Sequence, residues 1–490
     1  MELQTLIAQL GVWSTGKGPL YQKLARALGE AIRNGTVNPG VRLPSERILA
    51  DALTLSRTSV VAAYDALREE GWLESRSGSG TWVSRRSSGV AAARSAAQAG
   101  ALTGSSLLGL LAHHDDHADL IDLALGAPQP LTELPPELFT LPEDEYSALV
   151  RDRLYYPLGL ATLRQAIADY YSKAGLDTRP EQVLVTNGGQ QAIALCAGSY
   201  LQRGDSALIE DPSYFGALDA FRAAGARIST LPVEAAGVPP SSLRDRITAT
   251  SARLVYLTPT FQNPTGAVMP RAARKEVGRI ASEFGIPVID DGALADLILE
   301  GSPPAPIAAY APEAEAITIG SLSKLIWPGL RVGWLRASEP VIHRLARLKT
   351  TQDLGSPLLT QAIAVRLIGA IDEVRRLRRK QLKPRRDLLV SLLREQLPEW
   401  TFRVPEGGLF LWVKLPSGDA RELAQVSLRR GLVILPGPSM SAAEKHARFF
   451  RLPFLAEPET LRTAVSRLSA AWRDYQRADR PERRENVAMV

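Results

Sequence analysis

Apolar residues recur at helical spacing in the first part of the chain. The stretch "PLYQKLARALGEAIRNG" has apolar positions three or four residues apart and ends in Asn-Gly, which predicts an amphipathic helix and its end. A second helix is expected in "LPSERILADAL", with Ser45 accepting from free N–H groups at its start. A third is expected in "TLSRTSVVAAYDALREEG", where Ser56 caps the helix. Val60, Tyr64 and Leu67 should form its buried face.

The segment after these helices, "WLESRSGSGTWV", predicts two short strands around a glycine-rich turn. Three helices followed by two short strands, a so-called wing, are typical of a small DNA-binding domain. The first turn of the third helix contains Arg57, Thr58 and Ser59, which can reach base edges or phosphates when a helix N-terminus enters the major groove. A three-helix subdomain that only packs against its neighbour would show the same helical pattern.

A different pattern follows, in which short β-rich runs alternate with helical or loop segments. The runs are "QVLVT", "SALIE", "RLVYLTPT", "IPVIDD" and "AITIGS". This order predicts an α/β domain with a mainly parallel sheet and helices on both faces. Ligands of such sheets bind outside the carboxyl ends of the strands. Asn263, Asp291 and Lys324 each fall just after such a run, where a site is expected.

Composition divides the chain into four parts. We expect a compact domain over residues 17–86 and an Ala/Ser/Gly-rich linker over residues 87–118. The alternating α/β region should form a second domain over residues 119–475, and the polar residues 476–490 should form a tail. No internal repeat is visible in the sequence.

Charge and cysteine content narrow the possible binding partners and the cellular compartment. The chain of 490 residues carries a formal net charge of +6, and residues 17–86 hold 11 Lys/Arg against 7 Asp/Glu, which favours DNA over a membrane as partner. The single cysteine, Cys196, excludes an intramolecular disulfide framework. No apolar run reaches the roughly 20 residues that a membrane helix needs, and no secretory signal is apparent. We expect a cytoplasmic protein.

The run from "PLYQKL" to "GSGTWV" resembles the winged helix-turn-helix domain (α+β) of the GntR family over about 65 residues. The resemblance implies binding to double-stranded DNA, with the wing glycines allowing a close approach to the phosphates. The residues expected at the DNA are Arg47, Arg57, Thr58, Ser59 and Arg76, with Gly78 and Gly80 in the wing.

Motifs in the long region supply what an aldehyde cofactor on a pyridine ring with a phosphate tail needs. "VTNGGQQAI" ends a strand and opens a helix, so the N–H groups near Gly189 and Gln190 can meet a phosphate. Tyr214 of "EDPSYFG" could stack on the ring, and Asn263 of "TPTFQNPTG" could donate to a phenolic oxygen. Asp291 at the end of "PVIDD" could hold the ring nitrogen protonated. Taken alone, the Gly-Gly pair is compatible with a plain turn, and the tyrosine with a core side chain.

The motif "SLSKLIWPGLRVGW" completes this set. Lys324 is the candidate for a Schiff base with the aldehyde. Ser321 and Ser323 offer hydroxyl donors, and Arg331 can clamp the phosphate. A lone lysine in a loop is usually a solvated surface charge, but the ordered set of motifs favours the cofactor.

From "YYPLGLATLRQAI" to "FFRLPF", over about 330 residues, these motifs resemble class I aminotransferases of fold type I. The resemblance implies pyridoxal 5'-phosphate as cofactor and an α/β PLP-dependent transferase fold with a small C-terminal subdomain. It also implies that Arg451 takes the α-carboxylate of an amino compound, and that Tyr155 or Tyr156 lies near the phosphate of the partner subunit. Leu294 departs from the pattern, because the family usually has a tyrosine there whose hydroxyl supports the phenolic oxygen.

The missing phenol changes the expected chemistry. Asn263 has less help in stabilising the ionised phenolic oxygen when Leu294 replaces the tyrosine. We therefore predict a raised pKa for the Schiff base of the cofactor with Lys324, and little or no turnover.

Two charged segments are less specific. "HHDDH", residues 113–117, has metal-ligand residue types, but in a polar linker we interpret it as solvated and expect no metal site. "RRLRRKQLKPRR", residues 375–386, holds eight basic residues and no acidic one. Such a run usually indicates an exposed helix face, and a DNA-facing stripe is the alternative.

A GntR-type reader joined by a linker to an aminotransferase-like domain resembles the MocR/GabR subfamily of bacterial transcription regulators. This resemblance implies a homodimer on an operator with two half-sites, and pyridoxal phosphate itself or a small amino compound as effector. Two other interpretations remain: a catalytically active aminotransferase with a DNA-binding tether, and a purely structural dimerisation domain with an empty pocket.

Overall fold

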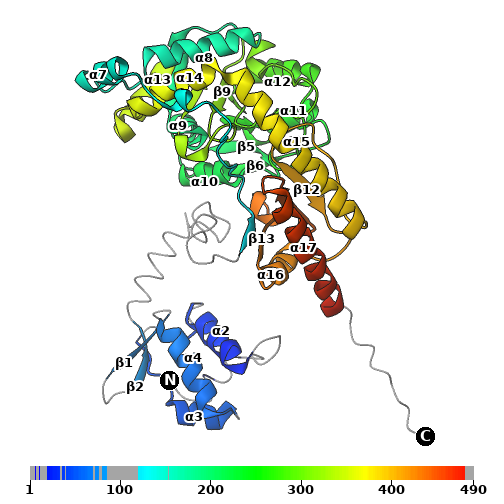
Figure 1. The fold of residues 1–490 in the computed structure, drawn as a ribbon. Helices are drawn as coiled ribbons and strands as arrows, with labels where there is room; N and C mark the ends of the chain where they lie inside the picture. The colour runs from blue at the N-terminus through cyan, green and yellow to red at the C-terminus, as the bar shows by residue number, and fades with distance from the viewer. Residues whose placement is uncertain are drawn as a thin grey trace. The chain divides into compact units, whose positions relative to one another are not determined.

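The computed structural model divides the chain into two compact units, Met1–Thr103 and Gly104–Val490 (Figure 1). The expected linker at 87–118, with its "HHDDH" segment, lies wholly outside the residues that the structure describes. The described residues are 19–33, 36–38, 40–53, 55–69, 72–76, 80–84, 120–152 and 154–479, together with Leu6 and Leu10.

The N-terminal unit contains the three helices and the two-stranded wing that its sequence predicts. The N–H of Ile48 donates to Ser45 Oγ over 3.4 Å, and the N–H of Ser59 donates to Ser56 Oγ over 3.1 Å, so both caps form as expected. The elements are α2 (Leu20–Arg33), α3 (Glu46–Leu53), α4 (Arg57–Glu69), β1 (Leu73–Arg76) and β2 (Gly80–Val83). Strands β1 and β2 pair antiparallel.

The core of this unit is apolar and is centred on α4. Val60, Tyr64 and Leu67 are buried, which confirms the predicted face of that helix. The hydroxyl of Tyr64 donates to the carbonyl of Pro44 over 2.9 Å, so this buried phenol has a partner at the entrance of α3. Helix α4 is thereby fixed against the segment that leads into α3.

The larger unit is built on a seven-stranded sheet in the order β4-β10-β9-β8-β7-β5-β6. All neighbouring strands are parallel except β10, which runs antiparallel to both β4 and β9. The five predicted runs all form strands, and β6 and β10 are additional. The strands are β4 (Val183–Thr186), β5 (Ser206–Asp211), β6 (Arg227–Pro232), β7 (Leu254–Leu257), β8 (Val288–Asp291), β9 (Ala316–Ser321) and β10 (Gly333–Arg336).

Helices cover both faces of this sheet, as side-chain alternation along the strands requires. Leu184 of β4 belongs to a core that includes residues of α9 (Gly189–Tyr200), α10 (Phe215–Ala223) and α13 (Glu339–Asp353). Its neighbours Val183 and Val185 point to the other face and join a second core. The helices of that core are α8 (Ala161–Lys173), α11 (Pro240–Thr250), α12 (Arg271–Phe284), α14 (Leu358–Gly369) and α15 (Ile371–Gln396).

A smaller five-stranded sheet, in the order β11-β12-β14-β13-β3, forms the C-terminal subdomain. Strand β3 comes from the start of the unit and pairs in parallel with β13, so two segments about 300 residues apart lie side by side. Helices α16 and α17 pack together beside this sheet. The elements are β3 (Ile121–Leu123), β11 (Thr401–Phe402), β12 (Phe410–Lys414), α16 (Ala420–Leu428), β13 (Leu432–Pro436), β14 (Phe449–Pro453) and α17 (Pro458–Asp479).

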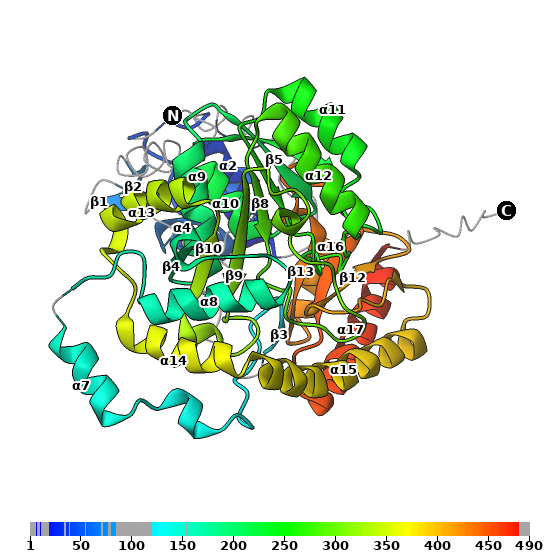
Figure 2. The ribbon, with the colours of Figure 1, turned by 90° about the horizontal axis from the view of Figure 1, so that it is seen from above.

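The remaining elements connect these layers. Helix α7 (Glu143–Arg151) lies at the edge of the unit next to α14 (Figure 2). None of the helices in the described part of the chain is long and apolar enough to span a membrane. The short 3-10 helices are η1 (Pro136–Phe139), η2 (Pro180–Gln182), η3 (Ile307–Ala309), η4 (Pro328–Leu330) and η5 (Gly437–Met440).

Candidate cofactor pocket and nucleic-acid interface

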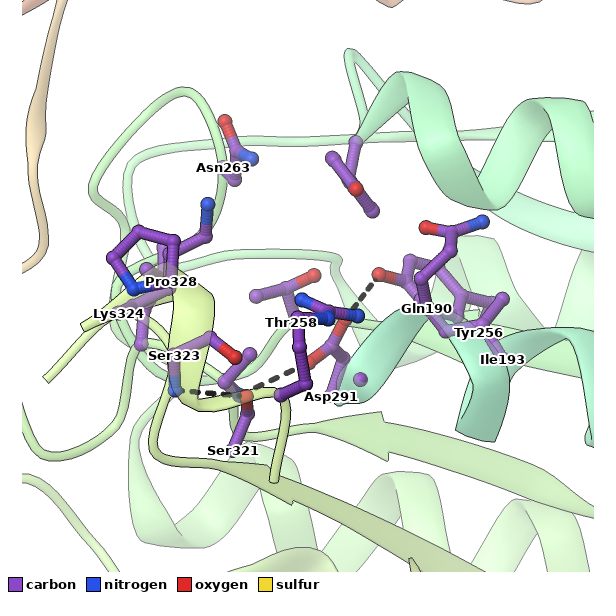
Figure 3. A pocket seen from close by; sticks show the side chains of 15 residues that line it. Gln190, Ile193, Tyr256, Thr258, Asn263, Asp291, Ser321, Ser323, Lys324 and Pro328 are labelled. Atoms are coloured by element: carbon purple, nitrogen blue, oxygen red, sulfur yellow. Dashed lines mark hydrogen bonds between the residues drawn. The ribbon is translucent and has the colours of Figure 1, made fainter. Parts of the chain in front are cut away.

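A pocket opens at the carboxyl ends of the central parallel strands and at the N-terminus of α9. Figure 3 shows Lys324 and Asn263 on one side of it and Gln190 and Tyr256 on the other, with Asp291 between them. The nine residues predicted to bind the cofactor all lie in its wall, although they come from five separate stretches of the sequence. The lining residues are Gly189, Gln190, Ile193, Tyr214, Tyr256, Thr258, Asn263, Asp291, Ala293, Leu294, Ser321, Ser323, Lys324, Pro328 and Arg331.

Asp291 ends strand β8 and its carboxylate is buried in the pocket floor. Tyr256 of β7 donates its hydroxyl to Oδ2, and the N–H of Ala293 donates to Oδ1 over 3.0 Å. Burial raises the pKa of Asp291, while the bonds from Tyr256 and Ala293 and the charge of Lys324 act in the opposite direction. The carboxylate is thus held in place by two donors and keeps acceptor capacity for a ligand.

Lys324 lies three residues beyond the end of β9, with its amine in the pocket. Its Nζ donates to the carbonyl of Gly126 over 2.7 Å. Burial is the main cause that lowers the pKa of Lys324 to about 8, and the cationic side chains of Arg451 and Arg331 add to it. A lysine with this pKa carries an appreciable fraction of neutral, nucleophilic amine near neutral pH.

The N-terminus of α9 and Arg331 form the other end of the pocket. Gly188 caps the helix with φ 82°, a conformation that glycine adopts easily. A Cβ at Gly188 would lie 2.8 Å from Nη2 of Arg331, so glycine also makes room for this guanidinium. Arg331 donates from Nη2 to the carbonyl of Asn187 over 2.6 Å. Helix N–H groups and a guanidinium together suit a phosphate.

Several buried polar atoms beside the pocket have no hydrogen-bond partner among the described residues. These include Oγ of Ser323, Oε1 of Gln190 and Oγ1 of Thr258. An unsatisfied buried polar atom is costly, so such atoms at one cavity indicate a ligand with complementary polar groups. The pocket therefore fits a cofactor that carries a phosphate, a ring nitrogen and an aldehyde.

Arg451 of β14 is buried just beyond the lining residues. Its Nη1 donates to Oδ1 of Asn263 over 3.1 Å, and Nη2 donates to the carbonyl of Ala124. The guanidinium carbon lies 4.1 Å from the ring centre of Phe410. Burial lowers the pKa of Arg451 to about 9. This cation, next to the lysine-bearing pocket, is in place to receive a carboxylate.

Other predicted residues of this unit differ in their placement. Tyr214 precedes α10 and lines the pocket, and burial raises its pKa to about 12. Leu294 also lines the pocket and brings no hydroxyl. Tyr155 is 72% exposed, and Tyr156 donates to Asp152, so neither lies in the pocket of this chain.

Sequence reasoning did not identify Tyr256, which binds the key aspartate. The residue stands in the run "RLVYLTPT", where a tyrosine among apolar residues resembles an ordinary core side chain. Its hydroxyl is the available signal, because a buried phenol requires a partner and the neighbouring strand ends in two aspartates.

The residues of the N-terminal unit that were predicted to contact DNA lie mostly at the starts of α3 and α4. Arg47, Arg57 and Thr58 are exposed there, and Ser59 is half-buried. Arg76 ends β1, and Gly78 lies outside the residues that the structure describes.

Arg42 is a cation of this unit that sequence reasoning did not single out. It forms an isolated β-bridge with Trp82 of β2. Gly80 has φ 91°, and a Cβ there would lie 3.2 Å from Nε of Arg42. The glycine therefore permits both the backbone turn and the arginine next to it.

The basic run at 375–386 is not the uniformly exposed face that its composition indicates. Arg378, Arg385 and Arg386 are buried in α15. Arg378 donates from Nε to the carbonyl of Leu325 and from Nη2 to that of Ile326, each over 2.8 Å. The backbone carbonyls of Leu325 and Ile326 thus take the place of the water that an exposed arginine would bind.

Part of the remaining basic run is paired with acids, whereas Arg379 and Lys380 are exposed. Arg375 contacts Asp296 and Asp372, and Arg376 contacts Glu373. This pairing reduces the charge available for a DNA-facing stripe. Among the described residues, no cluster of three or more His, Cys, Asp or Glu could hold a metal ion.

The two folds and the pocket define a protein class: a winged helix-turn-helix reader joined to a domain of the aminotransferase type. Residues 118–468 match the family "Aminotransferase class I and II", and residues 20–83 match "Bacterial regulatory proteins, gntR family". The chain belongs to the class I and II aminotransferase family and carries a gntR-family domain, which makes it a transcriptional regulator of the MocR type that binds DNA.

Relatives with both parts cover most of the chain. It is 33% identical to the HTH-type transcriptional regulator YisV of Bacillus subtilis, over 86% of this chain and 89% of that protein. It is 30% identical to the probable rhizopine catabolism regulatory protein MocR of Rhizobium meliloti, over 78% of each chain. The structure of LysN, an α-aminoadipate aminotransferase of Thermus thermophilus complexed with N-(5'-phosphopyridoxyl)-L-leucine, has a TM-score of 0.66 and 30% identity. That similarity covers 74% of this chain and 94% of LysN.

Proposed function

We propose that operator binding by this cytoplasmic regulator responds to pyridoxal 5'-phosphate, alone or with a small amino compound, held in the pocket at Lys324. The winged domain reads double-stranded DNA. The aminotransferase-like domain recognises the ligand and changes the arrangement of the readers. Such coupling requires that the ligand binds two arrangements with different affinity.

One observation carries this proposal: a single pocket brings together the groups that a pyridoxal cofactor requires. Lys324, Asp291 and Arg331 lie in its wall with the N-terminus of α9. No packing requirement explains why these charged groups converge on a cavity that also contains the unpartnered Oγ of Ser323. A purely structural dimerisation domain would not need them.

The cofactor, when bound, supplies an aldehyde that reacts with amines and a ring that draws electrons. Asp291 would pair with the ring nitrogen, with Tyr256 and Ala293 holding the carboxylate in position. Lys324 would present its amine to the aldehyde, and Arg331 would hold the phosphate against α9. These groups are fixed by strand ends and helix termini, so they are prepared before the ligand arrives.

Arg451 defines the effector end of the proposed site. Its guanidinium, which would bind a carboxylate, donates to Asn263 and lies over the rings of Phe410 and Phe215. A primary amine that also carries a carboxylate would place its amine near the cofactor and its carboxylate on Arg451. We therefore infer an amino acid or a related amino carboxylate as effector.

The regulator is proposed to act as a homodimer on two half-sites, because proteins with the aminotransferase fold are typically dimers. One edge of the larger unit supports this proposal with exposed apolar side chains. We define the apolar edge as Tyr146, Val150, Leu154, Tyr155, Leu354 and Leu359, which are between 44% and 72% exposed. Isolated exposed apolar residues are common, but a set on neighbouring segments indicates an interface.

A working aminotransferase with a DNA-binding tether is the second candidate. The complete pocket favours it, since Lys324, Asp291 and Arg451 are all present. Leu294 argues against efficient turnover, because an apolar side chain stands where a supporting hydroxyl is expected. The similarity to LysN also leaves about a quarter of this chain uncovered, whereas YisV covers 86% of it.

The proposed function is tested by absorbance and DNA binding measured on the same samples. Wild-type protein incubated with pyridoxal phosphate should gain a visible absorption band that Lys324→Ala lacks. Operator affinity of the wild type should change with pyridoxal phosphate or with added amino acids, and the variant should lose this response. A variant that kept both responses would refute the proposal, and sustained turnover with a keto acid would favour the enzyme.

A further inference from the structure

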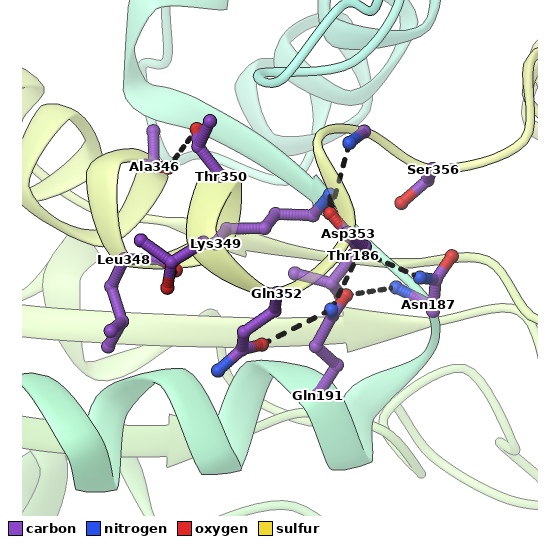
Figure 4. A network of polar contacts seen from close by, with 12 residues as sticks. Thr186, Asn187, Gln191, Ala346, Leu348, Lys349, Thr350, Gln352, Asp353 and Ser356 are labelled. Atoms are coloured by element: carbon purple, nitrogen blue, oxygen red, sulfur yellow. Dashed lines mark hydrogen bonds and ion pairs between the residues drawn. The ribbon is translucent and has the colours of Figure 1, made fainter.

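A buried ion pair outside the pocket connects two segments of the larger unit. Lys349 is fully buried in α13, and its Nζ donates to Oδ1 of Asp353 over 2.8 Å (Figure 4). Oδ2 of Asp353 accepts from Nδ2 of Asn187 over 2.9 Å and from Nε2 of Gln191 over 2.8 Å. The carboxylate therefore joins the end of α13 to the loop before α9 and to the first turn of that helix.

The loop held in this way forms the phosphate end of the pocket. The carbonyl of Asn187 accepts from Arg331 Nη2, and its N–H donates to Oε1 of Gln191 over 2.8 Å. The next residues are Gly188 and Gly189, whose backbone caps and opens α9. Asp353 thus fixes the loop that orients both the helix N–H groups and the guanidinium, although it does not line the pocket.

The same carboxylate also fixes the loop that leads to the apolar edge. The N–H of Gly355 donates to Oδ1 of Asp353 over 3.0 Å. A Cβ at Gly355 would lie 2.0 Å from the carbonyl oxygen of Tyr155, so this loop and the Tyr155 segment are in direct contact. Leu354, between Asp353 and Gly355, has φ 56° and is 48% exposed. Its exposed side chain is presented by a constrained backbone.

The charge of Asp353 is maintained despite partial burial. Burial acts to raise the pKa of this carboxyl, but the bonds from Gln191 and Lys349 outweigh it, so the pKa lies below its ordinary value. A buried lysine paired with one carboxylate is a costly arrangement if it serves stability alone, because apolar packing would do as well. The geometry of this carboxylate is more informative, since four donors from two separate segments converge on one side chain.

We propose that Asp353 is a positioning residue that couples occupancy of the phosphate end of the pocket to pairing of the apolar edge with a second copy of this chain. Displacement of the Asn187 loop by an incoming phosphate is transmitted through Asp353 to Leu354, Gly355 and the adjoining Tyr155 segment. This inference rests on the proposed function, in which pyridoxal phosphate binds in the pocket and the apolar edge forms the dimer. By linkage, the phosphate ligand and the second subunit then strengthen each other's binding by the same factor.

The first test compares two aldehyde probes that differ only in the phosphate, using full-length protein. In Asp353→Asn, the Kd for pyridoxal phosphate should rise about tenfold, the scale on which supporting residues affect a bound group. The Kd for pyridoxal, which lacks the phosphate, should change by less than about twofold, because the lysine end is intact. Equal losses for both probes would overturn the positioning role.

The second test measures the dimer dissociation constant by sedimentation, with and without pyridoxal phosphate. We expect the wild type to dimerise more tightly with the ligand by about fivefold or more, and Asp353→Asn to lose most of that difference. Gln191→Ala, which removes one donor from the partly exposed side of the network, should show a smaller loss and serves if the first variant does not fold. An unchanged ligand effect in both variants would refute the coupling.

The control is Glu457→Gln, which breaks an ion pair to the buried Arg385 in another part of the unit. This variant should keep the wild-type ratio of the Kd for pyridoxal phosphate to the Kd for pyridoxal. It should also keep the wild-type change in the dimer dissociation constant on addition of pyridoxal phosphate. A wild type that binds no pyridoxal phosphate would contradict the proposed function itself. A wild type that binds it but shows no effect on dimerisation would contradict only the coupling.

Discussion

Nη1 of Arg451 donates to Oδ1 of Asn263 over 3.1 Å, which joins strand β14 of the smaller sheet to the loop that follows β7. Because the carbonyl of the Asn263 amide is occupied, its N–H groups are directed elsewhere and are free for a ligand oxygen. The contact also holds a cation near Lys324. Two sheets that share no strand are thus connected at the point where cofactor and effector would meet.

This arrangement predicts the pH dependence of cofactor capture. The pKa of Lys324 is lowered to about 8, so the neutral amine that attacks the aldehyde increases as the pH rises through this value. In Arg451→Gln, one cation is lost, the pKa of Lys324 rises, and the pH midpoint of the capture rate should move upward. Stopped-flow absorbance across a pH series measures both midpoints.

The exposed Arg429→Gln provides the control for that series, because it removes the same charge at the end of α16. Its midpoint should match the wild type. If Arg451→Gln and the wild type gave the same midpoint, the electrostatic role of Arg451 at the lysine would be wrong.

The sequence predicts the fold well where a local pattern decides the structure. All five β-rich runs form strands, and the Ser45 and Ser56 caps form as expected, because each depends on neighbouring residues. Strand β10 is different: its first two residues, Gly333 and Trp334, end the lysine motif, and its antiparallel place between β9 and β4 depends on pairing with β4, which lies far away in sequence. The pairing of β3 with β13 has no local signal for the same reason.

The residues that line the pocket could be predicted from the sequence, but the residues that hold them in position could not. Lys324 and Asp291 belong to ordered motifs, and both line the cavity. Tyr256 and Arg378 act through contacts with segments far away in sequence, so a tyrosine in an apolar run and an arginine in a basic run gave no distinct signal. Their roles depend on which groups tertiary packing places opposite them.

Leu294→Tyr should supply the phenol that this position lacks. The new hydroxyl would support the ionised phenolic oxygen of the lysine-bound cofactor, so the pKa read from its absorbance should fall relative to the wild type. Turnover with an amino acid and a keto acid should rise. A pH titration of the visible band, with steady-state assays of both proteins, measures these changes. An ordinary aminotransferase pKa in the wild type would contradict the assigned role of Leu294.

Tyr256→Phe should weaken the support of Asp291. The bond from the hydroxyl lowers the pKa of that carboxyl against the effect of burial, so its removal raises the pKa further. The carboxyl then becomes neutral at a higher pH, and the loss of pyridoxal phosphate affinity on acidification should begin at a higher pH than in the wild type.

Titrations of cofactor binding at several pH values measure this effect. Tyr171→Phe is a matched control, because Tyr171 is also buried and accepts a hydrogen bond from Trp334 outside the pocket. Tyr171→Phe should lower the free energy of unfolding by about 1 kcal/mol. It should not change the pH at which affinity for pyridoxal phosphate begins to fall. If Tyr256→Phe and the wild type lost affinity at the same pH, the pKa of Asp291 would not depend on the hydroxyl of Tyr256.

Arg57→Ala should weaken DNA binding, because this side chain is exposed in the first turn of α4. If it contacts a phosphate, the slope of log affinity against log salt should fall in magnitude by about 0.9. If it reads a base edge, the loss of about 1–3 kcal/mol should be confined to particular operator sequences. Arg26→Ala, an equally exposed arginine on α2, is the control, and an equal effect of both changes would exclude α4 as the reading helix.

Gly188→Ala tests the phosphate end of the pocket, with a second glycine of positive φ as the control. Gly188 and Gly175 both have positive φ, 82° and 84°, so alanine strains the backbone at either position, and more so at Gly188, whose ψ of 172° lies in a region essentially confined to glycine. Only at Gly188 would the new Cβ meet Nη2 of Arg331, at 2.8 Å, whereas at Gly175 nothing lies within 4 Å. Both variants should therefore unfold at reduced denaturant concentrations, but only Gly188→Ala should lose affinity for pyridoxal phosphate relative to pyridoxal. Equal ligand affinities in the two variants would mean that the guanidinium of Arg331 does not hold the phosphate.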